Sequence, residues 1–162
     1  MHTSFIGITT AQSPADIAVW ERFLTDTDVS RIIEIGTYKW GMSLFFWLWC
    51  KTKTADFYTY DIKFFPATRV VRELGITKRF RMIDVFSITG EIGELIGSKG
   101  PTVVFCDGGN KPLELQTFSK YLKKSDFIGV HDWGEEVFQK DVPEELKLVE
   151  SGGKTRIYQY YA

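Results

Sequence analysis

Residues 31–43 read RIIEIGTYKWGMS, and this stretch decides which fold we expect. The β-branched run 31–35 predicts a buried strand, and Gly36 ends it with a tight turn. Helix-forming residues begin at about Trp40. A buried strand that passes through a glycine turn into a helix is typical of the first unit of an open α/β sheet.

Four more strand-like runs follow, each separated from the next by a segment of helix length. They cover residues 57–61, 80–84, 102–107 and 127–132. Helices are predicted over 66–74, around 90–96 and from Asn110-Lys111-Pro112 onward. Strands separated in this way predict parallel βαβ units with helices on both faces. We therefore expect an α/β fold, a Rossmann-like, doubly wound, mostly parallel sheet in three α/β/α layers.

The segments outside this alternation complete the expected fold. A helix is predicted to start at Ser13-Pro14, and another over 135–146, interrupted at Pro143. Residues 147–161 predict two antiparallel strands joined at Gly152-Gly153. We expect one domain over 1–162, with a helical segment at 1–28 and a Rossmann-like core at 29–162.

Charge and composition exclude several classes of function. Lys and Arg number 20 against 21 Asp and Glu, so the formal net charge of -1 argues against a surface built for nucleic acid or anionic lipid. Cys50 and Cys106 fit no zinc or disulfide spacing. The start of the chain does not resemble a signal peptide, and the apolar run 44–50 is far shorter than the ~20 residues that span a bilayer. We expect a cytoplasmic protein without a membrane segment.

The run 45–49, FFWLW, is apolar around the whole circumference of a helix. We expect most of this helix to lie in the core. Phe46 or Trp49 could instead face a second copy of the chain, which would make the protein a homo-oligomer.

An acidic residue stands at or near the end of each expected parallel strand. These residues are Glu34, Asp61, Asp84, Asp107 and Asp132. Because ligands of open α/β sheets bind beyond the carboxyl ends of the strands, this pattern predicts a cationic or hydroxyl-rich ligand there.

The loop after the first strand limits what that ligand can be. A dinucleotide site needs G-x-G-x-x-G, and Tyr38 stands where its middle glycine would let backbone approach a pyrophosphate. A nicotinamide dinucleotide enzyme is therefore disfavoured, and a nucleoside without phosphates fits better. Asp61 could accept hydrogen bonds from both ribose hydroxyls, and Asp84 could accept one from the exocyclic amine of an adenine.

Five short motifs now follow one another at the strand ends. They are EIGTY at 34–38, YD at 60–61, IDV at 83–85, FCDGG at 105–109 and VHDW at 130–133. Together they resemble the successive motifs of class I S-adenosylmethionine-dependent methyltransferases. The branch they resemble most contains small-molecule O-methyltransferases and cephalosporin hydroxylase-like sequences. The resemblance covers about residues 12–161, but four residues separate Gly36 from Gly41 where the family usually has three.

The resemblance implies S-adenosylmethionine as cofactor, a small-molecule acceptor, and a role for each matched residue. The methionine end would be held by Glu34, Gly36, Thr37, Tyr38, Gly41 and Ser43. Asp61 would hold the ribose, and Asp84, Val85 and Phe86 the adenine. Asp107 would lie beneath the sulfonium or beside the acceptor.

Three residues are candidates for catalysis. His131 is one of only two histidines, and its ordinary pKa suits a general base. Lys111 is the rival base, because it follows Asp107 closely on the same loop. Asp107 is the third candidate.

Asp107 and Asp132 also occupy the positions at which some O-methyltransferases resembling this chain bind a divalent cation. Carboxylate oxygens suit Mg²⁺. In those O-methyltransferases a third metal ligand, often Asp, Glu or Asn, stands next to the position of Asp132. This chain has Trp133 there.

Two further interpretations remain besides a methyltransferase that acts on a small-molecule hydroxyl. A non-catalytic module that binds S-adenosylmethionine or a nucleoside would have the same fold and no turnover. A nucleic-acid methyltransferase is disfavoured by the near-neutral charge and by the absence of an Asn/Asp-Pro-Pro-aromatic motif.

Overall fold

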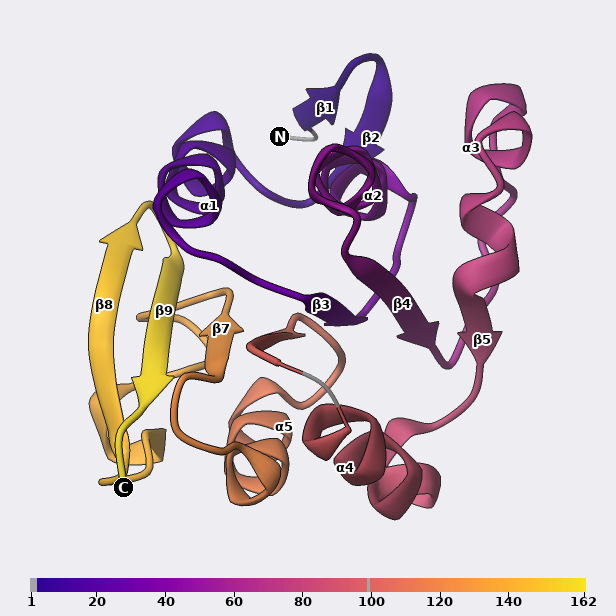
Figure 1. Cartoon of the computed structure of the whole chain (residues 1–162). Helices are drawn as coiled ribbons and strands as arrows, with labels where there is room; N and C mark the ends of the chain where they lie inside the picture. Colours follow the sequence, from indigo (N-terminus) through magenta and orange to yellow (C-terminus); the bar gives the residue numbers. More distant parts are fainter. Residues whose placement is uncertain (1–2, 99) are drawn as a thin grey trace.

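A seven-stranded sheet forms the centre of the computed structural model, which describes residues 3–98 and 100–162 (Figure 1). The strand order is β5-β4-β3-β6-β7-β9-β8. The strands are β3 Arg31–Ile35, β4 Asp56–Asp61, β5 Phe80–Met82, β6 Thr102–Cys106, β7 Phe127–Val130, β8 Leu146–Gly152 and β9 Thr155–Tyr160. The first five are parallel, and β9 pairs antiparallel with both β7 and β8. The expected α/β fold with a C-terminal hairpin is confirmed.

Helices cover both faces of this sheet. They are α1 Pro14–Asp26, α2 Gly41–Lys53, α3 Arg69–Glu73, α4 Thr89–Gly97 and α5 Lys111–Phe118, with 3-10 turns at Ile76–Arg79, Val85–Ile88, Ser119–Tyr121 and Gln139–Asp141. In Figure 1, α1 and α2 lie on one side of the sheet, and α4 and α5 on the other. The three-layer arrangement is therefore confirmed.

Alternation along the strands produces two apolar cores. Ile32 and Val103 point to the layer of α1 and α2, whereas their neighbours Ile33 and Val104 point to the layer of α4 and α5. All four side chains are fully buried. Period-two alternation of apolar residues on both faces is the pattern of a central parallel strand.

The aromatic helix lies in the core, as expected. Phe46 in α2 is fully buried, with edge-on ring contacts to Trp20 at 5.0 Å and Phe105 at 5.6 Å. Phe46 is therefore not available to a second subunit, which corrects one of the two expected interface residues. Trp49 is half-buried.

The N-terminal segment is more than a helix. Strands β1 Thr3–Phe5 and β2 Ile8–Thr10 form a separate antiparallel hairpin before α1. Gly41 packs against this hairpin so closely that a Cβ there would lie 2.5 Å from the carbonyl oxygen of Thr9. Helix α1 itself starts as predicted, because Ser13 and Asp16 form a reciprocal capping box.

Two expected helices are corrected. The first begins at Arg69 and not at Pro66, because the Thr68 side chain accepts a hydrogen bond from the backbone N–H of Val71 and caps it there. Residues 135–146 form no α-helix. The carbonyl of Asp132 accepts hydrogen bonds from the N–H groups of Glu136 and Val137, which turns the chain back, and β8 already starts at Leu146.

No helix in the described part of the chain is long and apolar enough to cross a bilayer.

Candidate functional site

A pocket of about 520 Å³ opens beyond the carboxyl ends of β3, β4, β5 and β6. Nine of the residues predicted for the site line it: Gly36, Tyr38, Asp61, Asp84, Val85, Phe86, Asp107, Lys111 and Asp132. The register of the parallel strands explains this convergence, because it brings their carboxyl ends to the same edge of the sheet.

The loop after β3 approaches the loop after β6 more closely than any side chain allows. A Cβ on Gly36 would lie 2.2 Å from the carbonyl oxygen of Asp107, and the φ of Gly36 is +94°. Tyr38 and Trp40 also have left-handed backbones, with φ values of 47° and 74°. The four residues between the two glycines are thus accommodated by a tight, strained turn at the pocket wall.

Asp61 is held in place by backbone groups. Its carboxylate accepts hydrogen bonds from the N–H of Tyr38 at 3.0 Å and from the N–H of Lys63 at 2.9 Å. Each carboxylate oxygen has further acceptor capacity. Asp61 can therefore accept hydrogen bonds from the hydroxyl groups of a ligand without losing its orientation.

Asp84 and the two residues after it form the next part of the wall. The Asp84 carboxylate accepts a hydrogen bond from the N–H of Phe86 at 3.0 Å and is exposed at the rim. Val85 is buried, and Phe86 stacks on Phe118 with the ring centroids 6.4 Å apart. An apolar wall beside a fixed carboxylate suits a flat heteroaromatic group with an amine.

Four of the predicted cofactor residues do not line the pocket. Glu34 and Ser43 are fully buried, Thr37 is nearly so, and Gly41 faces the β1–β2 hairpin. Glu34 accepts hydrogen bonds from Ser43 and from Thr59, the latter at 2.6 Å. These residues lie beneath the loop and outside the pocket lining, so the structure does not support their predicted direct contacts with a ligand.

Burial raises the pKa of Glu34 to about 8, although the hydroxyl groups of Ser43 and Thr59 act in the opposite direction. Glu34 is therefore largely protonated at neutral pH. A neutral acid can remain under the loop without the cost of burying a charge.

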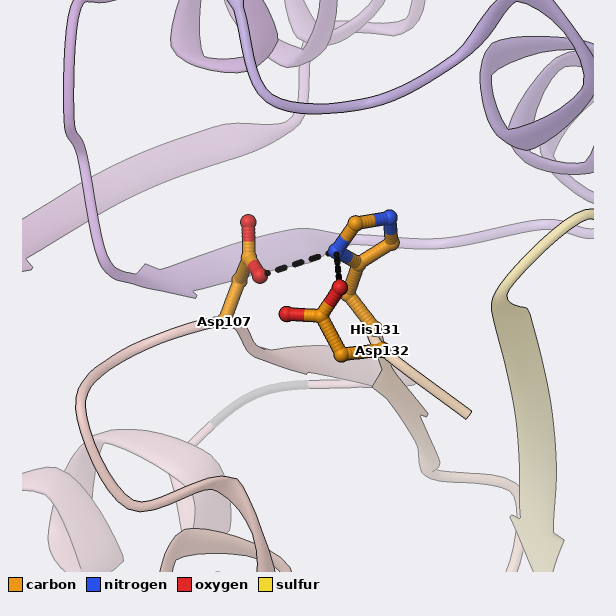
Figure 2. A group of neighbouring side chains, drawn as sticks. All are labelled: Asp107, His131 and Asp132. Carbon is orange, nitrogen blue, oxygen red and sulfur yellow. Dashed lines mark ion pairs between the residues drawn. The ribbon is translucent and has the colours of Figure 1, made fainter. Parts of the chain in front are cut away.

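His131 is buried among three carboxylates. Its Nδ1 lies 3.3 Å from Asp107 and 3.2 Å from Asp132, and its Nε2 lies 3.5 Å from Asp16. Figure 2 shows the side chains of Asp107 and Asp132 directed at the imidazole. Burial alone would lower the pKa of His131, but these carboxylates outweigh it and raise the pKa to about 10. His131 also does not line the pocket. A pKa raised in this way does not favour the predicted role of His131 as a general base.

Lys111, at the floor of the pocket, is likewise surrounded by carboxylates. Its ammonium lies 3.0 Å from Asp132 and 2.9 Å from Glu136, and it donates to the carbonyl of Gly108 at 3.1 Å. Burial acts against its charge, but the surrounding carboxylates raise its pKa well above the ordinary value. A lysine held among carboxylates in this way does not favour the predicted role of Lys111 as a base.

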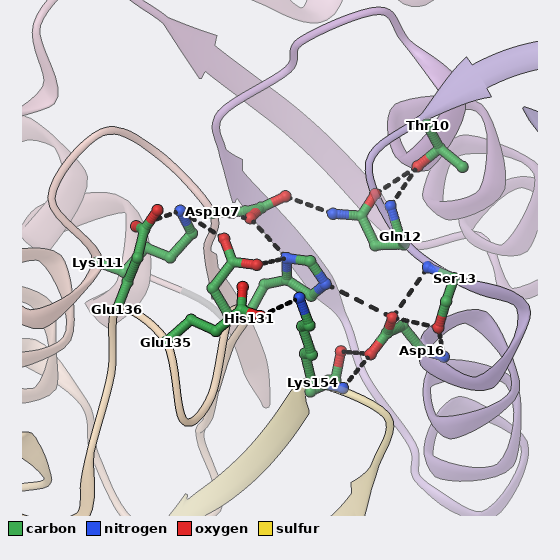
Figure 3. Close-up of polar contacts among 12 residues, drawn as sticks. Thr10, Gln12, Ser13, Asp16, Asp107, Lys111, His131, Glu135, Glu136 and Lys154 are labelled. Atoms are coloured by element: carbon green, nitrogen blue, oxygen red, sulfur yellow. Dashed lines mark hydrogen bonds and ion pairs between the residues drawn. The ribbon is translucent and has the colours of Figure 1, made fainter. Parts of the chain in front are cut away.

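Asp107 connects the floor of the pocket to the N-terminal segment. Its carboxylate accepts a hydrogen bond from the side-chain amide of Gln12, whose carbonyl in turn accepts from Thr10 (Figure 3). Burial raises the pKa of Asp107, while His131 and Lys111 act to lower it. Of the three catalytic candidates, Asp107 is the one at the pocket wall that is not a cation.

Sequence reasoning missed three residues of this cluster. Gln12 carried no signal, and Asp16 was interpreted only as part of a helix start. Glu136 was assigned to a helix that does not form. The one available signal for the other two was their charge, since Asp16 and Glu136 are both carboxylates.

Several solved structures have a similar fold. CmcI in complex with SAH superposes with a TM-score of 0.68 at 14% identity, over 97% of this chain and 81% of that chain. A mutant of MtNAS has a TM-score of 0.54 at 11% identity, over 87% of this chain and 57% of that chain. No protein-family model and no curated protein matches the chain.

The chain has the class I methyltransferase fold. This confirms the fold that the five motifs implied, and the pocket lies at the carboxyl edge of its sheet, where open α/β sheets bind ligands. The chain spans 57% of the MtNAS chain and of a second CmcI chain named for Mg and SAM, so likeness to them concerns the fold alone.

Three residues of this cluster are of the kinds that ligate metal ions. Asp107, His131 and Asp132 each offer one atom within 4.8 Å of the others. However, one of these three atoms is an imidazole nitrogen, and Asp132 already contacts the ammonium of Lys111 at 3.0 Å. The residues as they are arranged do not fit Mg²⁺, which prefers several oxygen ligands without competing cations.

Proposed function

We propose that this protein binds S-adenosylmethionine in the pocket and transfers its methyl group to a small-molecule acceptor, at a hydroxyl oxygen. One observation carries the proposal. Asp61 and Asp84, each fixed by backbone N–H groups, stand beside the apolar wall of Val85 and Phe86. The volume of about 520 Å³ is within the ~300–1,000 Å³ range of small-ligand pockets.

In this proposal each part of the wall contacts one part of the cofactor. Asp61 accepts hydrogen bonds from the ribose hydroxyls, and Asp84 accepts one from the adenine amine. Val85 and Phe86 cover the adenine ring. The turn at Gly36 and Tyr38 faces the methionine end. The sulfonium then lies toward Asp107, whose negative charge favours it.

For methyl transfer the protein needs to align the acceptor oxygen with the methyl group and to remove one proton. The acceptor oxygen attacks the methyl carbon, the carbon–sulfur bond breaks in line, and S-adenosylhomocysteine leaves. The hydroxyl proton goes to the carboxylate of Asp107, whose pKa is raised by burial and which Gln12 holds in place.

Calorimetric titration tests cofactor binding. S-Adenosylmethionine and S-adenosylhomocysteine should bind with micromolar Kd, and NADH should not. Asp61→Ala should weaken binding at least tenfold, whereas Asp28→Ala, which removes an exposed carboxylate at the opposite edge of the sheet, should leave Kd unchanged. Equal affinity in both variants would contradict the assigned ribose contact.

A binding module without turnover is the second candidate. It is favoured by the carboxylates that surround His131 and Lys111, because they stabilise the cationic forms of both and make them poor proton acceptors. Asp107→Asn separates the two functions. In an enzyme it should lower turnover on a hydroxyl acceptor with little effect on SAH binding, whereas a module binds SAH and methylates nothing on a panel of small hydroxylated acceptors.

A further inference from the structure

The ammonium of Lys111 lies in the middle of the acidic cluster at the pocket floor. Figure 3 shows Lys111 beside Glu136 and Asp107. Its Nζ lies 3.0 Å from Oδ2 of Asp132, 2.9 Å from Oε2 of Glu136 and 3.9 Å from Oδ1 of Asp107. Lys111 is only 6% exposed, so water does not screen these contacts strongly.

All three N–H donors of this ammonium have an oxygen within reach. Besides the carboxylates of Asp132 and Glu136, the carbonyl of Gly108 accepts a hydrogen bond at 3.1 Å. No donor remains for the acceptor of the reaction. Lys111 is therefore a positioning residue, which fixes the carboxylates around it and does not contact the reacting atoms.

Two of the carboxylates around Lys111, those of Asp107 and Asp132, are ones that a divalent ion would use. Asp107 and Asp132 offer two of the three atoms that lie within 4.8 Å of one another, and His131 offers the third. Each aspartate also contacts the imidazole, at 3.3 Å and 3.2 Å. A divalent cation at this point would repel the ammonium of Lys111, which already lies 3.0 Å from Asp132, at close range.

We infer that Lys111 is the built-in cation of this site: it occupies the place between Asp107 and Asp132 that a divalent metal would take, and it excludes the metal. The site then works without added metal. That consequence for turnover rests on the proposed function, whereas the exclusion of metal rests on the geometry alone.

Manganese binding tests the exclusion directly. Chelator-treated protein is titrated with Mn²⁺, and the free ion is followed by electron paramagnetic resonance. The wild type should leave the ion free at millimolar concentration. Lys111→Met, which keeps the length of the side chain and removes the charge, should bind about one Mn²⁺ per chain at least tenfold more tightly, and the added change Asp132→Asn should abolish that binding.

Lys154→Met is the matched control. Lys154 forms an exposed ion pair with Glu135 at 2.6 Å near the same loop, so its removal also subtracts one positive charge. It should leave Mn²⁺ binding as in the wild type. Binding that appears equally in both variants would overturn the inference, because net charge and not the place of Lys111 would then be responsible. A folded Lys111→Met protein that binds no more Mn²⁺ than the wild type would also overturn it.

If Lys111→Met does not fold, thermal unfolding of the wild type with and without Mg²⁺ tests the inference instead. Its Tm should shift by less than about 1 °C between excess chelator and millimolar Mg²⁺, because a ligand stabilises only the state that binds it. A larger rise that Asp132→Asn removes would overturn the inference. Titration with S-adenosylhomocysteine in chelator reports on the proposed function separately: absent binding contradicts that function and leaves the Mn²⁺ result unaffected.

Discussion

The side-chain amide of Gln12 donates a hydrogen bond to the carboxylate of Asp107, across 95 positions of the chain. Gln12 is almost fully buried, and its carbonyl accepts a hydrogen bond from Thr10 at the end of β2. The β1–β2 hairpin is therefore connected to the floor of the pocket, although it lies outside the main sheet.

Removing this contact should affect turnover more than binding. Gln12→Ala frees one oxygen of Asp107 and lets the carboxylate rotate, and a small misplacement of a reacting group is costly. We expect about a tenfold lower kcat with Kd for S-adenosylhomocysteine within twofold of the wild type. Gln116→Ala, on the exposed side of α5, is the control and should change neither value. An equal loss of binding and turnover would show that Gln12 only supports the fold.

The imidazole of His131 should stay protonated far above the ordinary pKa of a histidine. Its pKa is raised to about 10 in the folded protein, against 6.5 for the free side chain. The stabilisation that it contributes is therefore complete below pH 6.5 and is lost as the pH rises to 10. A pH titration by NMR of the His2→Gln variant leaves one histidine signal to follow. A midpoint near 6.5 would contradict the ion pairs described above.

Glu34 should make the protein less stable as the pH rises. Its pKa is raised to about 8 in the folded state from 4.5, so the folded chain holds a proton that the unfolded chain releases between these values. The free energy of unfolding therefore falls over that range, by on the order of a few kcal/mol in total.

Urea unfolding at pH 5 and pH 8 measures this contribution. Glu34→Gln should lose less stability between the two pH values than the wild type does. Glu94→Gln, at an exposed position of α4, should behave like the wild type. If the two variants respond alike, Glu34 is ionised in the folded protein.

Gly36 should tolerate no side chain. An alanine would place its Cβ 2.2 Å from the Asp107 carbonyl oxygen at a φ of +94°, so either the loop or the backbone after β6 must move. We expect Gly36→Ala to destabilise the fold by about 3 kcal/mol or more and to abolish ligand binding.

Gly90→Ala provides the control on α4, where a Cβ meets nothing within 4 Å. Alanine should stabilise that helix by about 0.5–1 kcal/mol. Thermal unfolding of both variants gives the comparison. A Gly36→Ala protein as stable as the wild type would mean that the close approach to Asp107 is not maintained in solution.

The fold could be predicted from particular residues because their signals are local. The β-branched run at 31–35, the glycine after it and the repeated alternation of strands and helices indicate a parallel sheet without knowledge of any contact. The same holds for Asp61, Asp84 and Asp107, since a residue at the end of a parallel strand lies at the ligand edge of the sheet whatever the side chains around it do.

The state of His131 and Lys111 could not be predicted in this way. The sequence by itself determined that both stand near the ends of β6 and β7, where ordinary pKa values would make His131 a base. Only the tertiary structure placed Asp16 and Glu136, from distant segments, against these two cations. Electrostatic energy depends on distances of 3–4 Å between charges. Such distances are set by the packing of α1 and of the loop after β7, and they cannot be predicted from the spacing of residues along the chain.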